Sequence, residues 1–88
     1  MAGLMKTSKL YPFMYRGICS DFNNATEDGY YHIHGQILNG PSASAYGVLI
    51  TFAPSYKTQL LFSFVGGVNY AYFRMGSSSG WTDWTLLT

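Results

Sequence analysis

The clearest pattern along the chain is an alternation of apolar and polar residues that recurs from residue 13 to residue 75. Successive side chains of an extended backbone point to opposite faces, so a period of two is typical of half-buried strands. Strands are predicted at 13–20, 30–37, 46–53, 58–65 and 68–75, followed by a closing strand at 80–87. No helical segment of useful length is indicated. The pattern predicts an all-β fold, a small, mainly antiparallel β-sandwich or meander of about six strands.

The alternation also assigns residues to faces. In 30–37 the set with Tyr31, Ile33 and Ile37 is the expected core face. The segment 46–53 is the most strongly β-like and is predicted to be a central strand. Each of the two middle strands also divides into two faces. In 46–53, one face carries Val48, Ile50 and Phe52, and the other carries Leu49 and Thr51. In 58–65, one face carries Leu60, Phe62 and Phe64, and the other carries Gln59, Leu61 and Ser63.

Glycine, proline and serine mark the predicted connections. Gly66-Gly67 suits a two-residue hairpin turn, and 54–56 a short hairpin loop. The segment 39–45 is expected to be an exposed loop of the kind that carries recognition. The segment 76–80 is expected to be a flexible crossing.

A structured corner is predicted at 21–29. Asp21 can cap a short helical turn near residues 21–27, with Asn23 inside it, and Thr26 can cap or bend the chain again. Asp28-Gly29 is a strong turn ending before the next strand. Asp21, Asn23, Thr26 and Gly29 are therefore predicted to be structural.

Trp81 and Trp84 are the only tryptophans. Each buries up to about 250 Å² when covered, so both are predicted to be structural residues of a closing strand on a preformed sheet. Their spacing would place the indoles on opposite faces of a regular strand.

Length and composition limit the function classes. Eighty-eight residues make one small domain, taken as 13–88, with 1–12 as a linker or the end of a preceding fibre segment. A net charge of +1 argues against nucleic-acid binding and, with no membrane-length apolar run, against membrane insertion. The single Cys19 predicts a buried, inert thiol. With 48% hydrophobic and 10% charged residues, the chain carries more apolar side chain than a lone small sheet covers, so we expect subunit contacts.

The candidate ligand-binding residues are aromatic side chains with polar tips and one cation. They suit either a wet subunit interface or a carbohydrate platform: Tyr30, Tyr46, Tyr70, Tyr72 and Arg74. His32 and His34 share one face of a strand, and three copies around a threefold axis would bring six imidazoles to a transition-metal ion. No other cofactor is expected.

Catalysis is not expected. Three of the four carboxylates crowd the polar corner at 21–28, where capping and turn formation explain them, and no pair facing across a cleft is indicated. No Gly-x-Ser-x-Gly elbow occurs.

The corner Asp21 to Tyr31, followed by Asn39-Gly40-Pro41, 46–50, 59–62, Phe73-Arg74 and Trp81-Thr82-Asp83-Trp84, resembles the knob domains of bacteriophage and R-type pyocin tail fibres. The resemblance covers roughly residues 17–87. The chain departs from the family pattern at Phe22 and in its apolar final hairpin.

What this resemblance implies is a β-rich knob at the tip of a homotrimeric tail fibre of a virion or phage-tail-like particle, which attaches to a bacterial surface receptor, often a glycan. Two alternatives stay open at this stage: a structural trimerising module without receptor binding, and a monomeric carbohydrate-binding module of a secreted enzyme.

Overall fold

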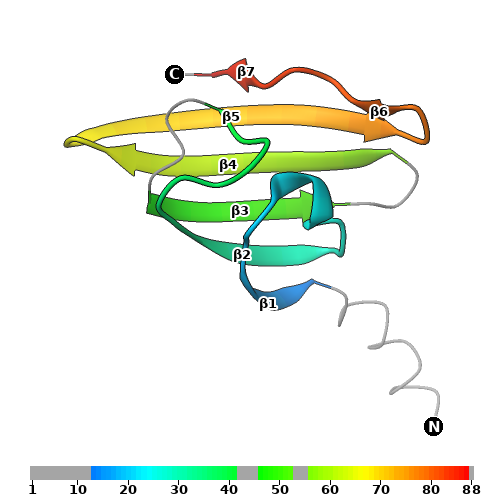
Figure 1. Cartoon of the computed structure of the whole chain (residues 1–88), viewed down its shortest axis with the longest axis horizontal. Coiled ribbons are helices and arrows are strands. Elements are labelled where there is room, and N and C mark those ends of the chain that lie inside the picture. The colour runs from blue at the N-terminus through cyan, green and yellow to red at the C-terminus, as the bar shows by residue number, and fades with distance from the viewer. Residues whose placement is uncertain (1–12, 42–45, 53–55, 88) are drawn as a thin grey trace, which may run out of the picture.

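The computed structural model describes residues 13–41, 46–52 and 56–87, in which seven strands form a single sheet (Figure 1). The strand order is β1-β2-β3-β4-β5-β6, with β7 also paired to β5. The predicted all-β fold is confirmed. The predicted linker at 1–12, residues 42–45 of the predicted loop at 39–45, and residues 54 and 55 of the predicted hairpin loop at 54–56 lie outside the described residues. The elements are β1 (Met14–Ile18), η1 (a 3-10 turn, Phe22–Asn24), β2 (Gly29–His34), β3 (Tyr46–Phe52), β4 (Lys57–Val65), β5 (Val68–Ser77), β6 (Gly80–Trp81) and β7 (Thr85–Leu86).

Strands β2 to β5 form an antiparallel meander, and β3 lies inside the sheet as predicted. Strand β1 pairs with β2 in parallel. Gly29 is needed at this junction, because its φ is 141° and a Cβ there would collide with the backbone oxygen of Met14. The predicted turn residue therefore also lets two strands approach closely.

Two hairpin turns connect the C-terminal strands. Gly66 and Gly67 both have positive φ, 57° and 80°, as the predicted two-residue turn requires. The expected flexible crossing at 76–80 is wrong: Ser77 pairs with Gly80, so the segment is a tight hairpin between β5 and β6. The predicted closing strand is split into β6 and β7, which is why seven strands are found.

The strand registers define two faces of the sheet, which we call inner and outer. The inner face carries a row of side chains that runs from β2 to β5, formed by Tyr31, Leu49, Leu61 and Tyr72. All four side chains are buried. The outer face carries the alternate residues of the same strands, among them Val48, Ile50, Phe52, Leu60, Phe62 and Phe64.

Two loop segments cover the inner face, as the turn η1 and the chain after β2 show in front of the sheet in Figure 1. They contribute the buried side chains of Cys19, Phe22, Ala25 and Ile37. Asp21 caps η1 by accepting a hydrogen bond from the backbone of Asn23 at 2.9 Å, which confirms the predicted capped turn. The hydrophobic core is thus a thin layer between one sheet and its own connections.

A second row on the inner face is polar. Thr51, Gln59 and Arg74 lie side by side on β3, β4 and β5, and all three are buried. Thr51 donates to the carbonyl of Ala25 at 3.0 Å, and the Gln59 amide donates to the carbonyls of Phe22 and Ala25 at 2.8 and 3.0 Å. This polar row satisfies carbonyls at the end of η1 and fixes the turn to the sheet.

Candidate functional site

Arg74 lies between the two tryptophans. Its Cζ is 4.1 Å from the centroid of the Trp81 ring and 4.6 Å from that of Trp84. The prediction that the two indoles lie on opposite faces of one regular strand is wrong, because the strand is interrupted at 82–84, between β6 and β7. Both rings therefore contact one guanidinium on the inner side. We call these three residues the arginine–tryptophan cluster.

The guanidinium is held in a fixed orientation. Its Nε donates to Oε1 of Gln59 at 2.8 Å, and Nη2 donates to Oδ1 of Asn23 at 2.9 Å. Burial lowers the pKa of Arg74 to about 10, so the group stays protonated at neutral pH. Two neutral acceptors and two aromatic faces compensate this buried charge.

Trp84 joins the cluster to the core. Its ring packs at an edge-on angle against Phe22, with centroids 5.3 Å apart, and against Tyr72 at 6.5 Å. The indole Nε1 donates to the carbonyl of Asn39 at 3.0 Å. Trp84 therefore connects the C-terminal segment to both covering loops, in keeping with its predicted structural role.

The corner is held by a second small network. Asn39 has φ of 62°, a conformation that Asn tolerates, and its Nδ2 donates to Asp21 at 2.9 Å. The hydrogen bonds from Asn39 and from the Asn23 backbone lower the pKa of Asp21. Thr26 is half-buried between η1 and β2.

Two hollows open beside Trp81. One, of about 420 Å³, is lined by the arginine–tryptophan cluster together with Asn23, Asn39, Gly40, Gly80, Thr82 and Asp83. The other, of about 320 Å³, lies over the β5–β6 hairpin and includes Tyr56 and two serines. Trp81 lines both hollows. The combination of indole faces, amides, a carboxylate and a guanidinium gives this region the donors and acceptors of a polar ligand site.

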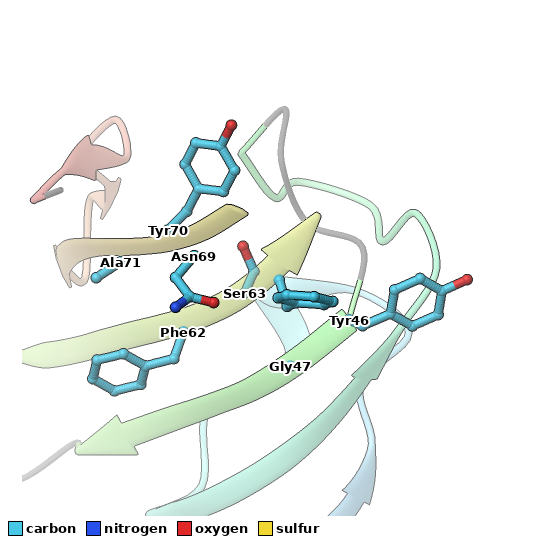
Figure 2. A pocket seen from close by; sticks show the side chains of 8 residues that line it. Tyr46, Gly47, Phe62, Ser63, Asn69, Tyr70 and Ala71 are labelled. Atoms are coloured by element: carbon cyan, nitrogen blue, oxygen red, sulfur yellow. The ribbon is translucent and has the colours of Figure 1, made fainter. Parts of the chain in front are cut away.

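The outer face is uncharged across β2 to β5 and largely apolar. A hollow of about 470 Å³ lies on it, between Tyr46, Phe62, Phe64 and Asn69 (Figure 2). Figure 2 shows Phe62 and Asn69 on one side of the strands and Tyr70 projecting to the other. This hollow is open and walled mainly by aromatic side chains.

The structure divides the predicted ligand-binding residues between the faces. Tyr30 and Tyr46 are exposed on the outer face, Tyr70 is half-buried on the inner face, and Tyr72 is buried there. The rings of Tyr70 and Tyr72 stack at 6.2 Å. Arg74 is 5% exposed and belongs to the arginine–tryptophan cluster. The five residues therefore do not form one site.

His32 and His34 both project from the outer face and are exposed, with ring centroids 6.0 Å apart. His34 also contacts Tyr46 at 5.1 Å. Within the described part of the chain, no three His, Cys, Asp or Glu side chains are grouped to hold a metal ion. A site shared by three copies therefore stays a prediction.

Burial raises the pKa of the Cys19 thiol to about 11, so the predicted buried thiol is confirmed and is protonated at neutral pH. Gln59 and Thr51 were not singled out from the sequence, yet they position Arg74 and η1. The only signal for them in the sequence is that both are polar residues at alternating positions of two neighbouring strands. A hydrophobicity pattern does not distinguish such buried polar residues from exposed ones.

No family model, curated protein or solved structure matches this chain. The resemblance to tail-fibre knobs therefore stays a prediction. Over the ranges that the structure describes, no helix has the length and hydrophobicity needed to cross a membrane.

Proposed function

We propose that this chain is the receptor-binding knob of a phage-like tail fibre, a non-catalytic module that assembles as a homotrimer and attaches to a bacterial surface glycan. The trimer and the attachment role follow from the resemblance. The observation that carries the proposal is the exposed apolar outer face.

The size of this face supports a subunit contact. Eight large side chains on it are between 40% and 53% exposed: Phe13, Tyr15, Tyr30, Tyr46, Phe52, Phe62, Phe64 and Met75. At about 200 Å² for each side chain, they present on the order of 700 Å². A standard interface buries about 800 Å² per partner, and the largest apolar patch of an ordinary monomer is about 300–600 Å².

Charge supports the same use. Exposed sheet surfaces of monomers usually carry Lys or Glu, which keep strands from associating. Across β2 to β5 the outer face has none, and its polar members include His32, His34, Thr58, Asn69 and, at the end of β5, Ser77. In the proposed trimer, the same uncharged, aromatic face of the other two copies is the partner that such a surface fits.

Light scattering tests the assembly. The wild-type chain is expected to be trimeric at micromolar concentration, and Phe64→Asp, which places a charge on the outer face, is expected to be monomeric. Leu38→Asp is the matched control, because Leu38 is 67% exposed but lies in the loop that covers the inner face. A wild-type monomer contradicts the proposal and favours a carbohydrate-binding module.

A glycan array with the wild-type domain tests attachment. Binding to bacterial surface glycans is the expected result. A trimer that binds no glycan supports the structural trimerising module instead. Elemental analysis of the same untagged protein tests His32 and His34: less than about one metal per three chains, unchanged by chelator, leaves them as surface residues.

A further inference from the structure

The two hollows beside Trp81 adjoin along the β5–β6 hairpin. Both are lined by Gly80, Trp81 and Thr82, so the indole stands where they meet. One side offers Tyr56, Ser77 and Ser79, and the other offers Asn23, Asn39 and Asp83. A groove with an aromatic ring at its middle and hydrogen-bonding groups on both sides suits a chain of sugar units better than one compact molecule, because the units can lie on either side of the ring.

Two cationic side chains lie beside Trp81, and they are the groups that an acidic ligand would meet. Besides Arg74, the Nζ of Lys57 lies 5.9 Å from the centroid of the Trp81 ring. The ion pair found within the described ranges joins Arg16 to Glu27, at the other end of the sheet, while the side-chain partners of Arg74 are the neutral Gln59 and Asn23. Arg74 lines the groove with the carboxylate of Asp83, and Lys57 lies beside Trp81 outside the lining. The charge of Asp21, which Asn39 binds, also acts on Arg74.

A carboxylate of the ligand is the group that would gain most from this site. A guanidinium held by neutral acceptors keeps donors that form strong, charge-assisted bonds with a carboxylate. Gln59 and Asn23 already fix its plane, so little further ordering is needed on binding.

We propose that the groove over Trp81 binds an acidic oligosaccharide, with a sugar ring against the indole and a sugar carboxylate beside Arg74. The inference rests on the proposed attachment function and names the site and the ligand class. It does not depend on the aromatic hollow of the outer face at Tyr46, Phe62, Phe64 and Asn69, although Met75 of the outer face also lines one end of the groove.

Intrinsic fluorescence is the direct readout, because Trp81 and Trp84 are the only tryptophans and both line the groove. The wild-type chain is titrated with a hexamer of galacturonic acid and, separately, with the neutral hexamer maltohexaose. A saturable change with the acidic hexamer, at least tenfold weaker with the neutral one, is the expected result.

Charge variants test the position of the ligand without removing a core residue. Asp83 is exposed, so Asp83→Asn removes repulsion and is expected to tighten binding of the acidic hexamer about three- to tenfold. Lys57→Gln is expected to weaken it by a similar factor. Glu27→Gln is the matched control, with the same charge change on a residue whose side chain is 65% exposed and outside both hollows, and it should leave the affinity unchanged.

Three results overturn the inference: no saturable response to the acidic hexamer, equal affinity for both hexamers, or an identical response to inorganic phosphate alone. Light scattering on the same samples separates this site from the proposed function. If the protein is a trimer but does not bind the acidic hexamer, the proposed groove is rejected and the proposed trimeric knob is retained. If the protein is a monomer that binds the acidic hexamer, the trimeric knob is rejected and the binding groove is retained.

Discussion

The inner and outer faces of the sheet reverse the usual distribution of polarity. The inner face buries Thr51, Gln59 and Arg74, whereas Phe62 and Phe64 are about half exposed on the outer face. The covering loops explain the difference: the carbonyls at the end of η1 need donors, and the polar row supplies them. Burial in this sheet therefore follows the hydrogen-bonding needs of the segment that covers it as much as hydrophobicity.

The largest expected difference between the faces comes from adjacent residues of β4. Leu61 is fully buried and Phe62 is 45% exposed. Leu61→Asp places an unpaired carboxylate in the core and should cost about 5 kcal/mol or more, which is comparable to the whole stability of a small domain. Phe62→Asp should remain folded but fail to associate. Circular dichroism and light scattering measure the two effects, and loss of folding in both variants would contradict the division into faces.

Removal of the Trp84 ring is expected to have the next largest effect. Trp84→Ala deletes the contacts with Phe22, Tyr72 and Arg74 and should reduce the free energy of unfolding by about 3 to 5 kcal/mol. Phe64→Ala on the outer face is the control and should cost less than about 1 kcal/mol. Urea denaturation at low protein concentration keeps association out of the comparison. A stable Trp84→Ala protein that only loses ligand binding would assign the ring to recognition.

A reversed pair of substitutions tests the polar row. Gln59→Leu makes the inner face more apolar, yet it should destabilise the fold by about 2 to 4 kcal/mol, because Arg74 Nε loses its acceptor and the carbonyls of Phe22 and Ala25 each lose one donor. Leu60→Gln makes the outer face more polar and should cost about 1 kcal/mol. Thermal denaturation compares the two. Equal stability of Gln59→Leu and wild type would show that the row contributes no specific stabilisation.

Acid is expected to give the smallest effect, through Asp21, which caps η1. The pKa of Asp21 is lowered in the folded chain by its hydrogen bonds with Asn39 and Asn23. The unfolded chain therefore binds the proton first, so this stabilisation is present above about pH 4 and is lost as the pH falls through the folded pKa. Asp21→Asn should flatten this part of the pH profile of stability. A pH profile identical to that of the wild type would show that Asp21 does not contribute to the acid sensitivity of the fold.

Much of the fold was predictable from residue patterns. The period of two separated Val48 from Leu49 and Leu60 from Leu61, and the pair Gly66-Gly67 fixed a hairpin. Which face of β3 and β4 is buried could not be predicted, because the more apolar set of residues, with Phe62 and Phe64, is the exposed one. Which set is covered depends on where η1 returns to the sheet, and that contact is not local in the sequence.

The arginine–tryptophan cluster could be predicted only in part from the sequence. The sequence points to all three members, but it predicts ligand binding for Arg74 and packing for the two tryptophans. The break in the strand at 82–84, which brings the indoles to one guanidinium, has no strong turn signal in Thr82-Asp83. The groove depends on this break and was therefore not predicted.

The hydrogen bonds that close the inner face have consequences for the order of folding. They join residues far apart in the chain: Gln59 to Phe22 across 37 positions, Trp84 to Asn39 across 45 and Arg74 to Asn23 across 51. The meander of β3, β4 and β5, in contrast, forms through short hairpin connections. Local contacts form faster than distant ones, so the aromatic outer surface should be assembled while the loops are still undocked. During that interval both sides of the sheet are open to other chains, and the yield of native protein should fall as the concentration in refolding rises.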